Sequence, residues 1–367
     1  MKFTCEKYLL QAAVTVTARA AASKSPNPAL EGLLIDVSDG VKLTGYDLLK
    51  GIYTSFEADV SESGSVVLSA RLFESIVRSL PDDMVTVSTE GNDVTRIKCG
   101  SADFSIKGIE AEKYPELPYI ECKSSVSIPQ KIVKDIISQT IFAVSDNESR
   151  PVYTGALFEI SGERLTIVSL DGYRLALRKE ALDESVENDY SFIVPKTALT
   201  DLERMCSDSD EPVGITVGDK HISFSVGDYV LVTRRLEGEF LDYKNSIPSN
   251  FQYELKVSRA DLLRAVERVS LIIDDRIKNP LRCVFGDERL NMRCATALGV
   301  GEDICEYEGD GGGIEIGFNN RYLMDALKAA PAENLIVSLN SGTAPCVILP
   351  EDKSDKFLYM ILPVRLK

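Results

Sequence analysis

The sequence has little of what most enzymes depend on. Its only histidine, His221, lies in residues 221–232, where apolar and polar side chains alternate, and no serine or cysteine nucleophile motif is nearby. Alternation is typical of a strand, so we interpret His221 as an ordinary strand residue and not as a catalytic base. The patterns GxxxxGK[ST], GxGxxG, GxSxG and HExxH are all missing. These absences favour a non-catalytic protein.

Other absences limit the remaining classes. The eight cysteines include no CxxC pair and no spacing that joins them to the histidine, so we interpret them as buried thiols and expect no metal and no cofactor. No run of 18 apolar residues occurs, and Glu6 and Lys7 interrupt the N-terminal segment where a signal peptide needs apolar continuity. We therefore expect a cytoplasmic protein. The one glycine cluster, residues 308–313, lacks the lysine of a phosphate loop and is expected to be a flexible connection.

What the sequence does contain is a long repeat. Residues 104–118, 229–248 and 357–363 each close a β-rich segment with aromatic and apolar residues before a proline. Their spacing of roughly 120 to 130 residues is far above the period of solenoids, so each copy is a whole domain. With 44% hydrophobic residues, the 367-residue chain can give every copy a core. We expect domains at residues 1–122, 123–249 and 250–367.

Each copy is predicted to contain two helices and about eight strands. The first helices are expected at residues 5–22, 129–144 and 258–273, and the second helices at residues 69–81, 194–206 and 319–331. Ser69 is a candidate N-cap, Pro195 a candidate first-turn proline, and Ser258 with Asp261 resembles a capping box. Hairpin turns are expected at Asp39-Gly40, Gly218-Asp219, Gly227-Asp228 and Gly286-Asp287. The fold class is therefore α+β, with two helices per copy on one side of antiparallel sheets.

The charge pattern is more informative than the net charge of −16. Cations recur at helical spacing on successive predicted helices: Arg71 and Arg78, Lys131 and Lys134, Lys196 and Arg204, Arg264 and Arg268, and Arg321 and Lys328. Acidic residues share these helices, so a single stripe is also consistent with a solvated face of mixed charge. The recurrence instead indicates a basic surface that faces a polyanion without reading bases.

Four separated motifs resemble one known family. Residues 169–175 (SLDGYRL), 227–243 (GDYVLVTRRLEGEFLDY), 317–322 (GFNNRY) and 359–366 (YMILPVRL) look like the bacterial DNA polymerase sliding clamp, the β subunit of polymerase III. The resemblance runs essentially end to end. It implies a non-catalytic homodimeric ring whose helices line a hole for duplex DNA and which tethers polymerases and repair proteins for processive synthesis. The cations above, with Lys24 and Arg150, would face the DNA, and acidic residues would lie elsewhere.

The resemblance also implies two contact surfaces. Phe104 and Ile106 on an edge strand match the family's apolar interface pair, and Ile272 and Ile273 match its partner pair. By periodicity alone, Phe104 fits an interface and a core equally well. Clamp loaders and polymerases would place short linear peptides in a cleft between the second and third domains. The matching positions are Tyr153, Leu170, Gly172, Tyr173, Arg174, Leu175, Leu241, Asn319, Tyr322, Met360, Leu362, Pro363, Val364 and Arg365.

The chain departs from the family pattern at a few positions. Asn245 and Ser246 replace an arginine and an apolar residue of many relatives, so one cleft wall should be more polar. Pro151 and Val152 stand where the family's reference member has aromatic residues near DNA. In the last strand we expect Tyr359 and Ile361 to point inward, and Met360 and Leu362 toward the cleft.

Two other functions stay open at this point. One is an acidic peptide-binding scaffold that never encircles DNA, which would leave circular and linear DNA equally fast. The other is a hydrolase with an unrecognised set of carboxylates, which predicts a deep cleft whose carboxylates have strongly shifted pKa values.

Overall fold

The computed structural model describes residues 1–118, 120, 125–273 and 279–366. The chain forms two compact units, one of residues 1–134 with 200–235 and the other of residues 135–199 with 236–367. Each antiparallel sheet lies within one of these units. Among the described residues, no helix has both the length and the apolar character needed to cross a membrane.

A five-stranded sheet in the first unit ends on a strand with a free edge. Its order is β5-β1-β7-β8-β9, with β5 at Asp59–Glu62, β1 at Lys2–Glu6, β7 at Met84–Thr89, β8 at Val94–Cys99 and β9 at Ala102–Lys107. Gly100, with φ +55°, lies in the turn of the β8–β9 hairpin. Within the described sheet β9 therefore has a neighbour on one side only.

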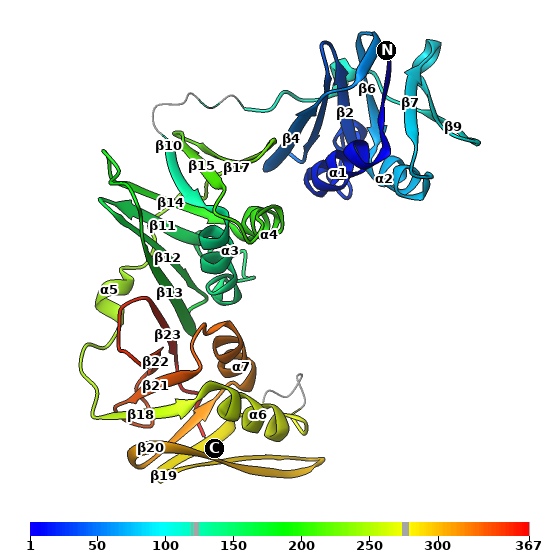
Figure 1. The fold of residues 1–367 in the computed structure, drawn as a ribbon. Helices are drawn as coiled ribbons and strands as arrows, with labels where there is room; N and C mark the ends of the chain where they lie inside the picture. Colours follow the sequence, from blue (N-terminus) through cyan, green and yellow to red (C-terminus); the bar gives the residue numbers. More distant parts are fainter. Residues whose placement is uncertain (119, 121–124, 274–278, 367) are drawn as a thin grey trace. The chain divides into compact units, whose positions relative to one another are not determined.

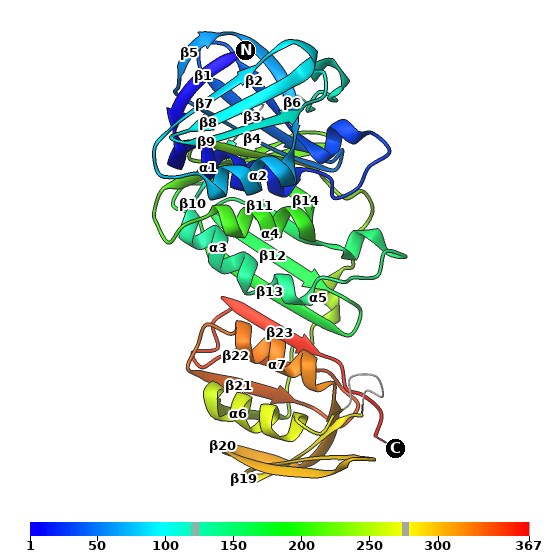
Figure 2. The same cartoon turned by 90° about the vertical axis from the view of Figure 1, so that its right-hand side faces the viewer.

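An eight-stranded sheet in the first unit joins the first copy to the second. Its order is β10-β15-β16-β17-β4-β3-β2-β6, with β10 at Ser125–Pro129, β15 at Pro212–Val217, β16 at His221–Val226, β17 at Tyr229–Arg234, β4 at Lys50–Phe56, β3 at Val41–Tyr46, β2 at Gly32–Val37 and β6 at Gly64–Ser69. Helices α1 (Lys7–Thr17) and α2 (Ala70–Ser79) lie side by side (Figure 2). They bury Leu10, Val14, Phe73 and Val77 in the core of the first copy.

A ten-stranded sheet in the second unit joins the second copy to the third. Its order is β14-β11-β12-β13-β23-β22-β21-β18-β20-β19, with β14 at Tyr190–Pro195, β11 at Gly155–Ser161, β12 at Arg164–Leu170, β13 at Arg174–Ala181, β23 at Phe357–Ile361, β22 at Cys346–Pro350, β21 at Asn334–Leu339, β18 at Tyr253–Ser258, β20 at Gly299–Phe318 and β19 at Leu281–Thr296. Helices α6 (Arg259–Ser270) and α7 (Asn320–Ala329) pack side by side (Figure 1) and cover the core of the third copy.

The predicted helices are present with shorter bounds. Strand β1 takes residues 5 and 6, and short 3-10 turns follow α1 at Ala18–Ala20 and α3 (Gln130–Ser138) at Ile141–Ala143. Ser258 caps α6 by accepting the N–H of Asp261 at 3.3 Å, as predicted, whereas Ser69 makes no capping hydrogen bond to α2. Pro195 ends β14 directly before α4 (Lys196–Met205).

Two predictions for the third copy are wrong. Gly286-Asp287 is no turn but lies inside β19, and residues 308–313 are no flexible connection but part of β20. The ladder is irregular where Asp287 faces Asp310, and Gly309, Gly312 and Gly313 have φ of +124°, +62° and +72°. Glycine adopts such φ values at little steric cost, so these residues form a bulge within one long hairpin. The other three predicted dipeptides do lie between paired strands.

Gly45 of β3 tests how closely α1 packs on the eight-stranded sheet. A Cβ there would lie 2.1 Å from the backbone oxygen of Thr17, the last residue of α1. We expect Gly45→Ala to lower the free energy of unfolding by about 2 to 3 kcal/mol, because backbone atoms cannot turn aside as a side chain can. Urea denaturation followed by circular dichroism measures this.

Gly214→Ala in β15 is the matched control. Its Cβ would lie 3.6 Å from that of Ser225, an ordinary contact. Equal stability of the Gly45→Ala chain and the wild-type chain would contradict the close packing of α1.

Candidate functional site

The turn between β12 and β13 is the centre of the candidate site. Asp171 Oδ1 accepts hydrogen bonds from the backbone N–H groups of Tyr173 at 2.9 Å and Arg174 at 3.0 Å. Gly172 has φ +89°, which favours glycine. This Asx turn holds the Tyr173 side chain out in solvent, where it is 63% exposed.

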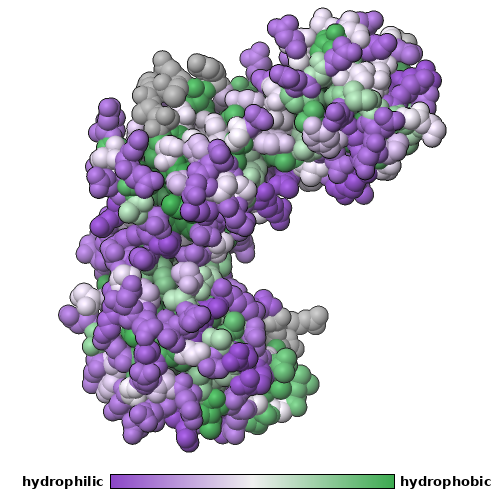
Figure 3. Space-filling model, in the orientation of Figure 1, coloured by the Kyte–Doolittle hydropathy of each residue, from purple (hydrophilic) through white to green (hydrophobic). Residues whose placement is uncertain are grey.

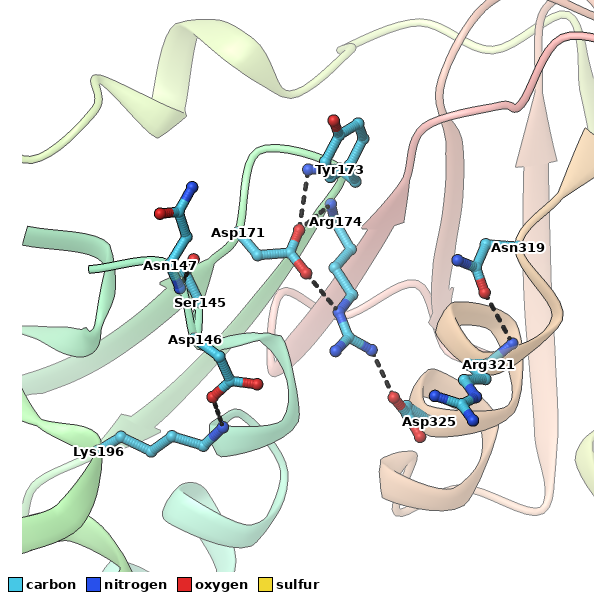
Figure 4. Close-up of polar contacts among 10 residues, drawn as sticks. All are labelled: Ser145, Asp146, Asn147, Asp171, Tyr173, Arg174, Lys196, Asn319, Arg321 and Asp325. Atoms are coloured by element: carbon cyan, nitrogen blue, oxygen red, sulfur yellow. Dashed lines mark hydrogen bonds and ion pairs between the residues drawn. The ribbon is translucent and has the colours of Figure 1, made fainter. Parts of the chain in front are cut away.

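Arg174 ties that turn to the third copy. Its side chain is 12% exposed, and its guanidinium binds Asp171 Oδ2 at 3.0 Å and Asp325 Oδ2 of α7 at 2.5 Å (Figure 4). The guanidinium carbon also lies 4.4 Å from the centre of the Tyr322 ring, and Tyr322 stacks on Tyr173 with 6.3 Å between ring centres. The ring of Phe142 lies 5.4 Å away as well, so two carboxylates and two rings hold the guanidinium, and Arg174 positions the two tyrosines.

An apolar cluster lies beside this network. The side chains of Leu170, Leu175 and Met360 are buried together with those of Leu157, Leu177, Ile193, Tyr243 and Val347. Tyr153 lies at the margin of the cluster and packs edge-on against Phe240, with 5.6 Å between ring centres. Leu241, in the same loop as Phe240, is 43% exposed. The structure therefore brings the predicted apolar cleft residues of the second and third copies together.

The last strand alternates as predicted. Tyr359 and Ile361 are buried in the core of the third copy, whereas Met360 belongs to the apolar cluster and is 8% exposed. Leu362 is half-buried.

The C-terminal segment borders a cavity. The backbone N–H of Leu362 donates to the oxygen of Tyr173 at 2.8 Å, and that of Val364 donates to the oxygen of Gly317 at 2.7 Å. A cavity of about 350 Å³ opens here, lined by Tyr173, Ile273, Asn279, Pro280, Phe318, Asn319, Asn320, Arg321, Tyr322 and Val364. Pro363 is half-buried and Arg365 is exposed, while Lys367 lies outside the described residues.

One anchor of the cleft wall was missed by sequence reasoning. The hydroxyl of Tyr243 donates to Glu159 Oε2, and Lys244 Nζ binds Glu159 Oε1 at 3.2 Å. Burial, and then the Glu159 carboxylate, raises the pKa of Tyr243. Asn245 is exposed and donates from Nδ2 to Asp242 at 2.6 Å. The glutamate lies more than 80 residues before its partners, so no local pattern could have revealed it.

The predicted DNA-facing cations are exposed or half-buried on helices and adjoining loops. At least seven of the twelve pair with a nearby carboxylate: Arg78, Lys131, Lys134, Lys196, Arg264, Arg268 and Lys328. The expectation that acidic residues lie elsewhere is therefore wrong for this set. Exposed ion pairs of this kind contribute little net stability, and the DNA-facing role of these cations stays a prediction.

The two predicted interface pairs have different surroundings. Phe104 is 37% exposed on the edge strand β9, which excludes its interpretation as ordinary core, and Ile106 packs against the core of the first copy. Ile272 and Ile273 follow α6 and are half-buried. Hydrophobic surface also covers the tip of the β19–β20 hairpin (Figure 3), where Leu298 is 81% and Val300 56% exposed.

Catalytic arrangements are not found among the described residues. Seven cysteines are free and buried, Cys122 lies outside the description, and no metal-binding group is formed by the residues that the structure covers. Burial lowers the pKa of His221, helped by Arg234 and Lys220. Burial raises the pKa of Glu203. Hydrogen bonds and ion pairs lower the pKa of six other carboxyl groups: Asp103, Asp261, Asp303, Glu351, Asp352 and Asp355. None of these lines the cavity beside Tyr173, which does not match the hydrolase alternative.

Three domain families match successive parts of the chain. Residues 1–118 match the N-terminal domain of the DNA polymerase III beta subunit, residues 127–242 the central domain and residues 244–365 the C-terminal domain. The chain belongs to this sliding-clamp family. This confirms the prediction made from four motifs, and with it the α+β fold of three clamp domains and the sliding-clamp function. The predicted domain boundaries at residues 122 and 249 stay a prediction.

Individual relatives match this chain over essentially their whole length. The Beta sliding clamp of Staphylococcus epidermidis is 32% identical over 377 residues, which cover 100% of this chain and 99% of the relative. The crystal structure of the Bacillus subtilis DNA polymerase sliding clamp has a TM-score of 0.96 at 30% identity and full coverage of both chains. The Pseudomonas aeruginosa clamp, solved bound to griselimycin, has a TM-score of 0.94 at 25% identity, also with full coverage.

Proposed function

We propose that two copies of this chain close into a non-catalytic ring around duplex DNA, and that the cleft beside Tyr173 and Met360 tethers polymerases and clamp loaders by short peptides. The ring proposal rests on one observation: sheets continue from one copy into the next at two junctions within the chain. Strand β17 of the second copy pairs with β4 of the first, and β23 of the third pairs with β13 of the second.

The two junctions have the same register. In the first junction the third residue of β17, Leu231, lies opposite the third residue of β4, Ile52. In the second, the third residue of β23, Tyr359, lies opposite the third residue of β13, Ala176. Leu231 and Tyr359 are both 0% exposed. The corresponding third residue of β9 is Phe104, which is 37% exposed. Phe104 therefore occupies a position that is buried wherever a neighbouring copy is present.

A second chain supplies the missing neighbour. Tyr359 packs edge-on against Phe142, which follows α3, with 5.3 Å between ring centres. Ile272 and Ile273 follow α6 in the same way, so Phe104 of one chain would pack on them in another. Strand β9 would then extend the hairpin of residues 289–306. A head-to-tail contact that closes after two copies leaves no free strand edge at this position.

Cationic helices suit the hole of such a ring. Duplex DNA is a dense line of phosphates, and weak contacts to phosphate carry no sequence information and fix no register. The cations of α6 and α7 exchange between carboxylates and phosphates at little cost, which permits sliding. The net charge of −16 disfavours binding of DNA to the outer surface.

Retention on DNA tests encirclement. Protein loaded on nicked circular DNA should stay bound, and linearisation should release it within the time needed to slide off an end. Gel filtration of the loaded DNA before and after cutting measures this. Equal loss from circular and linear DNA would favour the peptide-binding scaffold and contradict the ring.

The interface assignment makes a prediction about mass. Replacing Ile272 and Ile273 together by aspartate should yield monomers, because charges would be buried at both junctions of the ring. Leu241→Asp is the matched control, since it places the same charge on an exposed leucine of the cleft. Sedimentation velocity gives the masses, and an unchanged dimer mass for the double variant would remove the assignment.

The cleft assignment makes a prediction about peptides. Deleting residues 363–367 removes Val364, which bonds to Gly317, and one wall of the cavity. We expect binding of a labelled polymerase tail peptide to fall below detection in fluorescence anisotropy, with only a small loss of thermal stability. The Gly214→Ala chain, altered in β15 and not at this cavity, should still bind the peptide. Undiminished affinity after the deletion would discredit the cleft.

A further inference from the structure

Each of the two junctions within the chain carries an ion pair between a strand and a helix. Lys50, the first residue of β4, binds Asp201 of α4, and Arg174, the first residue of β13, binds Asp325 of α7. The partners are 151 residues apart in both pairs. Asp201 and Asp325 are each the sixth residue of a ten-residue helix. The same device is thus present twice, in matching positions.

The turns that aim the two cations also match. Asp47 Oδ1 accepts the N–H groups of Leu49 at 2.9 Å and Lys50 at 2.8 Å, as Asp171 does for Tyr173 and Arg174. The second turn residue has a positive φ in both, +75° at Leu48 and +89° at Gly172. Each turn therefore places its fourth residue, the cation, toward the helix of the next copy.

The third junction lacks both charges. The sixth residue of α2, which is also ten residues long, is Ser75. The turn at the β19–β20 tip has Thr296 paired with Gly299, and Leu298 N–H donates to Thr296 Oγ1 at 3.1 Å. Gly299 therefore stands where the other two turns have Lys50 and Arg174. A chain–chain junction built on the same plan would bring serine against glycine.

Because Lys50, Asp201 and Arg174 are buried, the residue opposite each of them affects stability. The side chains of Lys50 and Asp201 are 12% and 6% exposed, whereas those of Arg174 and Asp325 are 12% and 41% exposed, so only the cation of the second pair is buried. A buried ion pair adds little net stability, because both ions lose their hydration. A buried ion without its partner is strongly destabilising, so such a pair selects the surface that can dock.

We propose that these charges sort the equivalent sheet edges of the ring, a role that rests on the ring proposed above. If β9 of one chain docked on β4 of another, Lys50 would be buried against Ser75, and if it docked on β13, Arg174 would keep Asp171 but have no partner on the helix. If β17 docked on β20, Asp201 would be buried against Gly299, and if β23 docked there, the partly exposed Asp325 would lose its cation. Only β9 and β20 both lack a charge at this junction position, so they match each other across chains. The ring therefore closes and opens at the junctions between chains, while the junctions within each chain keep their partners.

A single substitution with an isosteric control tests the sorting. Ser75→Asp places a carboxylate opposite Gly299. Ser75→Asn introduces a side chain of the same shape as aspartate but without its charge. We expect Ser75→Asp to raise the dimer dissociation constant at least about tenfold and Ser75→Asn to change it by less than about threefold, as measured by sedimentation at serial dilutions. Equal constants for the two variants of a dimeric wild type would overturn the sorting but leave the ring. A monomeric wild type would overturn the ring itself.

A double-mutant cycle tests the pair within the chain. Lys50→Met and Asp201→Asn should each lower the melting temperature, and the double variant should recover at least half of the larger loss, because neither ion is then left alone. The same cycle at Arg282 and Glu315, which are each 42% exposed, is the control and should show no coupling. Additive losses at Lys50 and Asp201 would contradict the proposal.

Discussion

Hydrogen bonding between strand edges of neighbouring copies is the interaction on which the rest of this structure depends. Within the chain, β17 of the second copy extends the sheet of the first copy, and β23 of the third copy extends the sheet of the second. A strand edge that stays unpaired exposes a row of backbone donors and acceptors and invites aggregation. We propose that the free edge of β9, the strand that carries Phe104, makes a contact of the same kind with a second chain.

The cleft is a consequence of the second of these contacts. Pairing of β23 with β13 brings Met360 onto Leu175 and places α7 next to the turn at Arg174. Residues from both copies then surround one apolar cluster and one cavity. A site assembled in this way combines hydrophobic anchoring with few polar groups, which suits short peptides. The proposed peptide site and the architecture thus depend on the same strand pair.

The sequence predicted the features that depend on local patterns. Repeats, helices, the cap at Ser258 and most turns follow from residue types within a few positions. The bulge around Asp287 and Asp310 was missed, because a Gly-Asp dipeptide is typical of a turn. In the structure, β20 continues to pair with β19 on both sides of this dipeptide. The anchor at Glu159 and the pair of Lys50 with Asp201 were missed because their partners lie far apart in sequence. The turn that carries Lys50, DLLK, does match DGYR at Arg174, and that likeness was the available signal.

Hydrogen exchange of the β9 backbone tests the central claim most directly. Amides of residues 102–107 that face the free edge should be protected at concentrations where the chain is dimeric and should exchange rapidly on dilution. Amides of β17 should stay protected at every concentration, because their receiving strand is in the same chain. Exchange of β9 at one rate across all concentrations at which the mass changes would contradict the account.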